Sequence, residues 1–284
     1  AAIRRGIKSQ FASTQEHRQR IVNLIKDYRT LLGQGVVARF DPETYSDAVA
    51  FARIGEGSLG GKARGLAFMN SMILKHRLYD KHANVRIMIP RSVVIATDYF
   101  DDFIRLNGLK YIISQEFSDE ELLSEFVSST VPARLQQELK AYIQTVRTPL
   151  AVRSSSKLED SHYQPFAGIY STYMIPYVDN GDQMLRLLLK AVKSVYASVY
   201  FATSRAYLSS SQNLISEEKM AVIIQEVCGT EQDGLFFPTF SGVARSINYY
   251  PIGDEAPADG VCNIAMGLGK LVVDGATRRT KCWR

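Results

Sequence analysis

A glycine-rich segment that ends in a lysine is the first part of this sequence that could do chemistry. Four of the seven residues from Gly55 to Gly61 are glycine, and Lys62 follows them directly. Glycines let backbone N–H groups turn toward an anion, and the start of a following helix adds a favourable dipole. Lys62 adds a full positive charge that suits phosphate. The segment therefore predicts a phosphate-facing loop at the start of a helix.

The spacing of these glycines fits three kinds of phosphate-binding loop to different degrees. It matches the G-x-G-x-x-G dinucleotide fingerprint, but the acidic residue about 20 positions on is Asp80, which precedes the next expected strand instead of ending it. A P-loop is excluded, because Glu56 stands at its first glycine position and Ala63 replaces the Ser or Thr that holds magnesium. A phosphate loop of another kind and a flexible turn with a surface lysine both stay open.

Two apolar segments end in polar side chains that suit a nucleotide. A short apolar strand precedes Arg153 and Ser154, and residues 220–224 precede Gln225 and Glu226. An arginine offers fixed, paired donors to phosphate oxygens, and a strand end is rigid enough to hold a site. The amide and backbone after the second strand could read an adenine. The alternatives are a capped turn and an ordinary core strand with polar edges.

Two further segments combine loop-forming residues with possible ligands. Residues 159–168 are polar and end at Gly168, so they predict a loop that could close over a substrate. His162 in this loop is interpreted as a plain loop residue, because no partner lies at motif spacing. Residues 267–275 predict a glycine turn near Asp274, which could meet a metal or belong to a simple hairpin.

Hydrophobic periodicity predicts the elements that must position these segments. The expected helices cover residues 12–33, 63–78, 97–107 and 182–208, and two more begin at Ser118 and Thr130. The expected strands cover residues 85–89, 92–96, 150–152, 169–175, 219–227, 235–248 and 261–266. Strands and helices mix without strict alternation, which predicts an α+β fold rather than one doubly wound sheet.

Local signals predict some of the boundaries more closely. Thr97 is expected to cap its helix, and Ser118 with Glu121 has the spacing of a capping box. A turn is expected at Ser241-Gly242, within the strand segment 235–248.

Composition limits the class of protein. The chain has 284 residues and a net charge of +5, and 46% of its residues are hydrophobic, which excludes disorder and allows about two domains. Three cysteines without a C-x-x-C pair predict a reduced, cytoplasmic protein without a disulfide framework or structural zinc. Because no apolar stretch approaches the roughly 18 residues of a membrane span, no membrane partner is expected. The weak basic charge favours a solvated surface over a nucleic-acid partner.

Taken in order, the segments resemble the nucleotide-binding half of the phosphoenolpyruvate synthase and pyruvate phosphate dikinase family. The order and spacing are specific, and the resemblance covers about residues 54–276. The matching segments are Gly60-Gly61-Lys62, Ile89-Pro90 with Thr97, Val152-Arg153-Ser154-Ser155, Glu159-Asp160, Phe166-Ala167-Gly168, Tyr196-Ala197-Ser198 with Arg205-Ala206, Ile224-Gln225, Ser241-Gly242-Val243 and Gly267-Leu268-Gly269.

The resemblance implies an ATP-grasp-like α+β fold in which two subdomains enclose a nucleotide cleft. Residues 54–148 would form the first subdomain and residues 149–284 the second. Residues 1–53, which match nothing in the family, would be an N-terminal helical extension. Because the first residue is Ala1 rather than Met, the chain is interpreted as a piece of a longer protein or a processed chain.

The resemblance also implies roles for individual residues. Lys62 and Arg153 would contact the phosphates of ATP as the catalytic residues. Mg²⁺ would neutralise the phosphates, with Asp274 as the nearest remaining acid to bind it. Gly168 would end the loop over the γ-phosphate, and Gln225 would lie near the adenine. The remaining nucleotide-binding residues would be Gly60, Gly61, Ser154 and Glu226.

In the family, ATP phosphorylates a histidine on a separate swivelling domain, and that histidine passes the phosphoryl group to pyruvate in a barrel domain. The Thr-x-His acceptor motif is absent here, so the histidine domain and the pyruvate-binding barrel are expected elsewhere in a full-length protein. Asn263 and Lys270 stand where the family has acids. This departure supports an alternative: a degenerate ATP-grasp module that senses nucleotide or holds a partner without catalysis.

Overall fold

The computed structural model describes residues 18, 37–43, 45, 49–115, 117–156, 170–210, 218–269 and 272. The chain divides into two compact units, residues 1–226 and residues 227–284. The helix expected over 12–33, apart from residue 18, lies outside the described residues, as do the segment 159–168, Lys270 and Asp274. No helix in the described ranges is long and apolar enough to cross a membrane.

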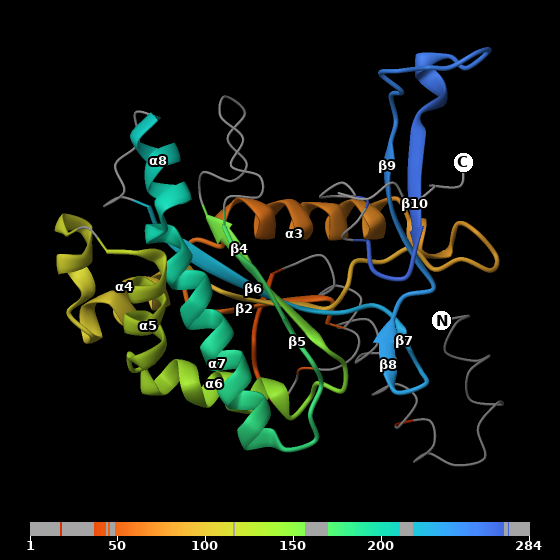
Figure 1. The fold of residues 1–284 in the computed structure, drawn as a ribbon. Coiled ribbons are helices and arrows are strands. Elements are labelled where there is room, and N and C mark those ends of the chain that lie inside the picture. Colours follow the sequence, from red (N-terminus) through yellow and green to blue (C-terminus); the bar gives the residue numbers. More distant parts are fainter. Residues whose placement is uncertain are drawn as a thin grey trace, which may run out of the picture. The chain divides into compact units, whose positions relative to one another are not determined.

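A six-stranded mixed sheet forms the centre of the first unit, in the order β1-β2-β3-β6-β4-β5 (Figure 1). β1, β2 and β3 are parallel, whereas β6 is antiparallel to β3 and β4, and β5 is antiparallel to β4. The strands are β1 (Ala38–Arg39), β2 (Phe51–Ile54), β3 (Ser92–Ile95), β4 (Leu150–Ser156), β5 (Thr172–Ile175) and β6 (Met220–Glu226). The mixed sheet and its helices confirm the α+β class. The subdomain boundary near residue 149 stays a prediction, and β4 beyond it shares the sheet with β2 and β3.

Helices cover both faces of this sheet, because alternate strand residues point to opposite sides. On one face, Val222 and Ile224 of β6 belong to the larger core, which also contains residues of α4, α5, α6 and α7. On the other face, Ala221 and Ile223 of β6 pack with Ala63 of α3. Figure 1 shows α3 apart from the other helices. The helices are α3 (Gly60–Lys75), α4 (Thr97–Leu106), α5 (Asp119–Ser128), α6 (Ala133–Ile143), α7 (Gly181–Ala197) and α8 (Ala202–Ser210). The start of α3 therefore lies on the face opposite to the large core.

The second unit consists of two antiparallel pairs of strands. β7 (Thr230–Gln232) pairs with β8 (Leu235–Phe237), and β9 (Phe240–Arg245) pairs with β10 (Val261–Met266). Asp233 and Gly234 both have positive φ between β7 and β8, so the hairpin turn lies there. The turn expected at Ser241-Gly242 is wrong, because both residues lie inside the β9–β10 ladder.

The strand expected over 85–89 is also wrong. These residues form no regular strand, and Val85 makes only an isolated bridge to His82. Val85 and Met88 are more than half exposed, and β-propensity is realised only where side chains pack on a sheet. Both edges of the adjacent strand β3 are already paired, with β2 and β6, so no sheet position is left beside it.

The single helix expected over 182–208 is interrupted. α7 ends at Ala197, a short 3₁₀ turn follows at Ser198–Tyr200, and α8 begins at Ala202. The hydroxyl of Ser198 donates to the Val195 carbonyl at 2.7 Å, and serine bonds of this kind compete with regular helix geometry. Periodicity alone does not detect such a break, because apolar positions continue on both sides of it.

The expected helix starts have mixed outcomes. The capping box of Ser118 and Glu121 at the start of α5 is confirmed. Thr97 is not a cap, because Ala96 holds the N-cap position and the Thr97 hydroxyl bonds to another segment. The helix expected from Thr130 begins at Ala133.

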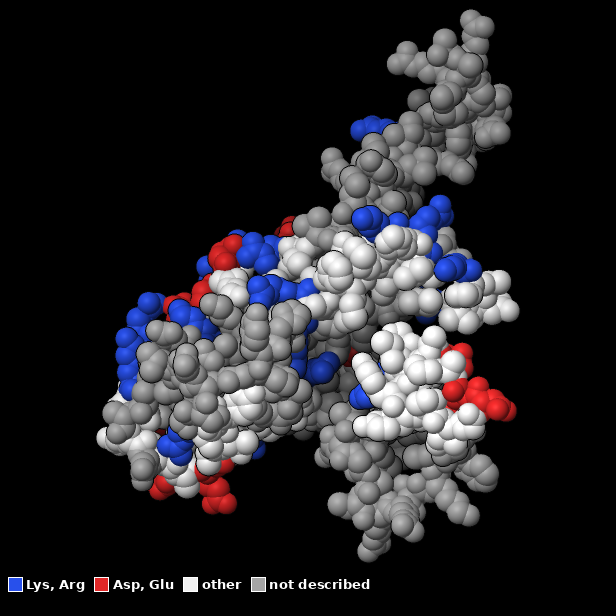
Figure 2. All heavy atoms as spheres, turned by 90° about the horizontal axis from the view of Figure 1, so that it is seen from above, with Lys and Arg blue, Asp and Glu red and all other residues white. Residues whose placement is uncertain are grey.

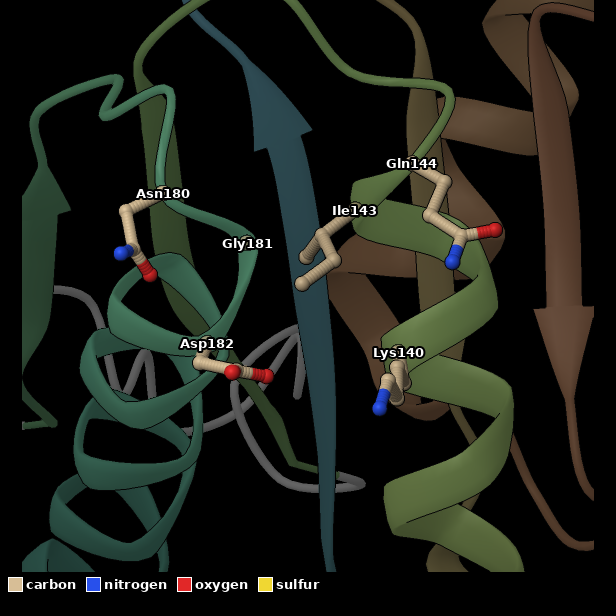
Figure 3. A pocket seen from close by; sticks show the side chains of 6 residues that line it. All are labelled: Lys140, Ile143, Gln144, Asn180, Gly181 and Asp182. Atoms are coloured by element: carbon tan, nitrogen blue, oxygen red, sulfur yellow. The ribbon is translucent and has the colours of Figure 1, made fainter.

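Charged side chains are spread over the surface. On the face drawn in Figure 2, the lysine and arginine side chains of the described residues lie in several places, with acidic side chains among them. In the first unit, two hollows of about 390 and 220 Å³ share Ile143, Gln144 and Gly181, where α6 ends and α7 begins (Figure 3). None of the sequence-predicted site residues lines either of these two hollows.

Candidate functional site

The start of α3 rests directly on the end of β4. Gly60 has a φ of +72°, and a Cβ atom there would lie 1.8 Å from the Ser155 carbonyl oxygen. The Ser155 hydroxyl accepts the Ala63 N–H at 3.0 Å and donates to the Leu59 carbonyl at 2.8 Å. Glycine is thus required at position 60 for two independent reasons, its backbone conformation and the closeness of β4. This role of Ser155 is not predictable from its sequence position alone.

Lys62 extends from the first turn of α3 to Ser154, the residue before Ser155 in β4. Its Nζ atom donates to the Ser154 hydroxyl at 3.2 Å, and Ser154 is fully buried. The first turn of α3 contains no acidic residue. The helix dipole and the lysine therefore both add positive charge at this end of the helix, which suits an anion such as phosphate.

Arg153 belongs to a row of polar side chains that crosses three neighbouring strands. Its Nη1 atom donates to Gln225 Oε1 at 3.2 Å, and Gln225 Nε2 donates to the Ser92 hydroxyl at 3.1 Å. Ser92 in turn donates to the Pro90 carbonyl at 2.9 Å. Because the last acceptor is main chain, the row fixes the direction of the Gln225 amide, and this amide orients the Arg153 guanidinium.

The structure thus joins four of the predicted site residues through direct contacts or sequence neighbours. Lys62 contacts Ser154, Ser154 follows Arg153 in β4, and Arg153 contacts Gln225. Ser92 completes the row, and the sequence contained no motif signal for it. The start of α3 adds Gly60 and Gly61, both buried.

Glu226 is held elsewhere. Its carboxylate pairs with Arg91 at 2.6 Å, with both side chains largely buried, and accepts from the Thr148 hydroxyl at 3.4 Å. Glu226 alternates with Gln225 along β6, so the two side chains point to opposite faces of the sheet. The nucleotide-binding role of Glu226 stays a prediction.

The front of the glycine segment contacts the start of α4. The Thr97 hydroxyl accepts the Ser58 N–H at 3.0 Å, and the Thr97 N–H donates to the Ser58 carbonyl at 3.0 Å. Asp98 Oδ2 accepts the Glu56 N–H at 2.9 Å. Sequence reasoning missed this contact, and the only signal for it was that Thr97-Asp98 directly follows a predicted strand.

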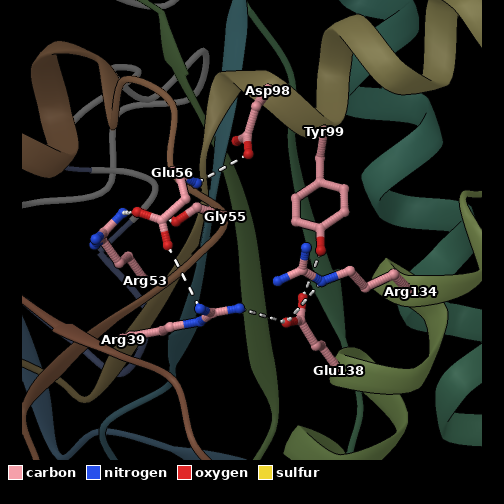
Figure 4. A network of polar contacts seen from close by, with 8 residues as sticks. All are labelled: Arg39, Arg53, Gly55, Glu56, Asp98, Tyr99, Arg134 and Glu138. Carbon is pink, nitrogen blue, oxygen red and sulfur yellow. Dashed lines mark hydrogen bonds and ion pairs between the residues drawn. The ribbon is translucent and has the colours of Figure 1, made fainter.

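Ion pairs surround the same segment (Figure 4). The Glu56 carboxylate lies 2.7 Å from Arg53 and 3.7 Å from Arg39, and Arg39 lies 4.0 Å from Glu138. Glu138 accepts from the Tyr99 hydroxyl at 2.8 Å. Burial, followed by this hydrogen bond, raises the pKa of Tyr99, so its hydroxyl keeps its proton at an alkaline pH at which a free tyrosine would ionise. Single exposed pairs contribute little stability, but together these contacts link the loop to β1, β2, α4 and α6.

The magnesium prediction lies outside the described residues. Asp274 falls there, and the described part of the chain contains no group of three His, Cys, Asp or Glu side chains that could hold a metal ion. Mg²⁺ binding stays a prediction.

Comparisons with known proteins point to one family. A family model described as "Pyruvate phosphate dikinase, AMP/ATP-binding domain" matches residues 56–283. The chain is 28% identical to an uncharacterized phosphotransferase, YvkC, of Bacillus subtilis strain 168, covering 80% of this chain and 24% of that protein. It is 24% identical to a phosphoenolpyruvate synthase of Aeropyrum pernix, covering 76% and 25%, and 26% identical to a probable phosphoenolpyruvate synthase of Staphylothermus marinus, covering 66% and 23%. The chain spans about a quarter of the length of these relatives.

Proposed function

Since this chain belongs to the family of pyruvate phosphate dikinase AMP/ATP-binding domains, we propose that it binds ATP at the start of α3 and transfers a phosphoryl group from it. The acceptor would be a histidine on a domain outside this chain. The relatives named an uncharacterized phosphotransferase and a phosphoenolpyruvate synthase support an enzyme of the kinase type. The ATP-grasp arrangement of two subdomains around a nucleotide cleft is part of the proposal.

One observation carries the proposal: Lys62 at the acid-free start of α3 contacts β4, and the next cationic side chain, Arg153, comes from the same strand. Ser154 contacts the Lys62 ammonium, and Gln225 orients the Arg153 guanidinium. Both cations would contact the phosphates, and Gln225 would lie near the adenine. Phosphoryl transfer depends mainly on positioning and charge neutralisation, which are the two properties that such residues supply.

The proposed transfer breaks a phosphorus–oxygen bond of ATP and forms a phosphorus–nitrogen bond to the histidine. Lys62 and Arg153 would stabilise the negative charge on the phosphate oxygens as the leaving oxygen separates. When bound, a magnesium ion would add to that charge neutralisation. As the family resemblance implies, pyruvate in a barrel domain outside this chain would then receive the phosphoryl group.

Transfer can be tested with ATP labelled at its β- and γ-phosphates and a separately supplied histidine domain from a synthase relative. The proposal predicts an acid-labile phosphohistidine on that domain. The label should be lost with Lys62→Ala or Arg153→Ala and kept with Lys75→Ala, which removes a lysine from the other end of the same helix. Equal labelling by all four proteins would contradict the proposed roles of Lys62 and Arg153.

A second candidate function is favoured by Asn263, which lies on β10 where the family resemblance implies an acid. In this alternative the chain binds nucleotide without catalysis and senses it or holds a partner. ATP binding that is independent of magnesium, together with no labelling of the histidine domain, would support the alternative over transfer.

A further inference from the structure

We propose that Asp98 is a positioning residue for nucleotide binding. In this proposal Asp98 holds the glycine loop, defined as residues 55–59, in the conformation that places the start of α3 for phosphate. The inference rests on the proposed function and adds to it a residue outside the predicted phosphate and adenine contacts.

Three hydrogen bonds join the first two residues of α4 to the glycine loop. Asp98 accepts the Glu56 N–H, and Thr97 both accepts from and donates to the main chain of Ser58. These bonds satisfy backbone groups of a loop that forms no strand or helix of its own. The loop conformation is therefore dictated by α4 as well as by its own glycines.

The position of α4 is itself fixed. Four of its ten residues, Tyr99, Phe100, Phe103 and Ile104, are buried in the large core. The side of α4 that contacts the loop is thus part of a rigid helix, and Asp98 cannot follow the loop if the loop moves. A rigid support is what a positioning residue requires.

The glycines of the loop fit the Asp98 side chain closely. A Cβ atom on Gly55, where φ is +94°, would lie 2.5 Å from Asp98 Oδ1, and one on Gly57 would lie 2.6 Å from the Asp98 backbone nitrogen. Oδ1 is buried and accepts no hydrogen bond from the part of the chain that the structure describes. It therefore faces the bare Cα of Gly55, and the start of α4 provides a favourable dipole for its charge.

The glycine loop leads directly into the candidate site. Residue 60 follows it and contacts Ser155 of β4, so the segment is held by α4 at its front and by β4 at its back. Loss of the Asp98 bond would leave the Glu56 N–H without its acceptor, while Thr97 would still hold Ser58, so the front of the loop would be held less firmly. The loop would then have to be ordered again each time that a nucleotide binds, which lowers affinity.

The test compares three variants of the 284-residue chain by two measurements. Asp98→Ala removes the acceptor, Asp98→Asn keeps an acceptor oxygen, and Asp102→Ala removes a carboxylate from the same helix that pairs with Arg105 instead of the loop. The first measurement is hydrogen exchange of the Glu56 and Ser58 amides without ligand. The second is the dissociation constant of ATP.

We expect Asp98→Ala to speed exchange of the Glu56 amide, which loses its acceptor, more than that of the Ser58 amide, which keeps Thr97. The same variant should weaken ATP binding about tenfold, the value of one hydrogen bond to a charged group. Asp98→Asn should restore both measurements to within about threefold, because it keeps the accepting oxygen. Asp102→Ala should match the unaltered chain in both. If Asp98→Asn restores both measurements at an unchanged free energy of unfolding, the accepted hydrogen bond holds the loop. A role of the Asp98 charge in overall stability alone would not produce that result.

Two results would overturn the inference. Unchanged amide exchange in Asp98→Ala would show that Asp98 does not hold the loop. Faster exchange with unchanged ATP affinity would show that holding the loop does not matter for binding. If the unaltered chain binds no ATP, the proposed function fails. Faster amide exchange in Asp98→Ala would then still show that Asp98 holds the loop, but only as a structural contact.

Discussion

Both folding stability and the proposed ATP binding depend on glycine at position 60. Its positive φ and the Ser155 carbonyl, 1.8 Å from an added Cβ, predict that Gly60→Ala lowers the free energy of unfolding by about 1–3 kcal/mol and abolishes ATP binding. Gly65→Ala is the matched control in the same helix, because nothing lies within 4 Å of its added Cβ. That control should gain roughly 0.5–1 kcal/mol. Urea unfolding and calorimetric titration with ATP measure both effects, and equal behaviour of the two variants would contradict this account of Gly60.

Glu226 allows a structural role to be separated from a binding role. Removing one partner of its largely buried pair with Arg91 leaves an uncompensated charge, so Glu226→Ala should lower the free energy of unfolding by about 3 kcal/mol. ATP affinity should hardly change, because the carboxylate points to the face opposite to Gln225. Urea unfolding gives the first quantity and titration with ATP the second. A large loss of affinity in a variant of normal stability would instead favour the predicted nucleotide contact.

Sequence reasoning found the charged members of the candidate site and missed their supports. Lys62 and Arg153 stand out because glycines and a buried strand precede them. Asp98 and Ser92 gave no such signal, because their roles depend on which strands become neighbours. The order β3-β6-β4 brings segments far apart in sequence together, and no local pattern encodes that order.

At the scale of elements, the break between α7 and α8 depends on two buried serines. Ser204 donates its hydroxyl to the Ser198 carbonyl at 2.6 Å, and both residues are fully buried. Ser204→Ala leaves that carbonyl without this donor and should lower the free energy of unfolding by about 1–3 kcal/mol. Thermal or urea unfolding measures this change.

Ser128 provides the control for this prediction. Its hydroxyl also donates to a backbone carbonyl, that of Glu125, at the exposed end of α5. Water can replace that bond, so Ser128→Ala should change stability by less than about 0.5 kcal/mol. If Ser204→Ala and Ser128→Ala had the same free energy of unfolding, the buried hydrogen bond of Ser204 would not stabilise the break between α7 and α8.

Elements were predictable where local chemistry decides them. The Ser118–Glu121 capping box and the apolar strand before Arg153 are confirmed, because side-chain spacing alone specifies them. The strand expected over 85–89 is wrong because β-branched residues form a strand only beside an open sheet edge, and pairing of β3 on both sides leaves none there.

At the scale of the whole molecule, the order of weak motifs along the chain was more informative than any single motif. The family match over residues 56–283 confirms the family resemblance that this order indicated. The α+β class is also confirmed, whereas the ATP-grasp arrangement, the magnesium site and the acceptor domain stay predictions. Those three depend on Asp274, on residues between 157 and 169, or on domains outside the given sequence, none of which the structure describes.

The central claim is that Lys62 at the start of α3 binds the phosphates of ATP. The most direct test measures thermal unfolding of the unaltered chain, Lys62→Ala and Lys75→Ala at increasing concentrations of ATP. At a ligand concentration 100 times the dissociation constant, the unaltered chain and Lys75→Ala should each gain about 2.7 kcal/mol, and Lys62→Ala should gain far less. Equal stabilisation of all three proteins by ATP would contradict the claim.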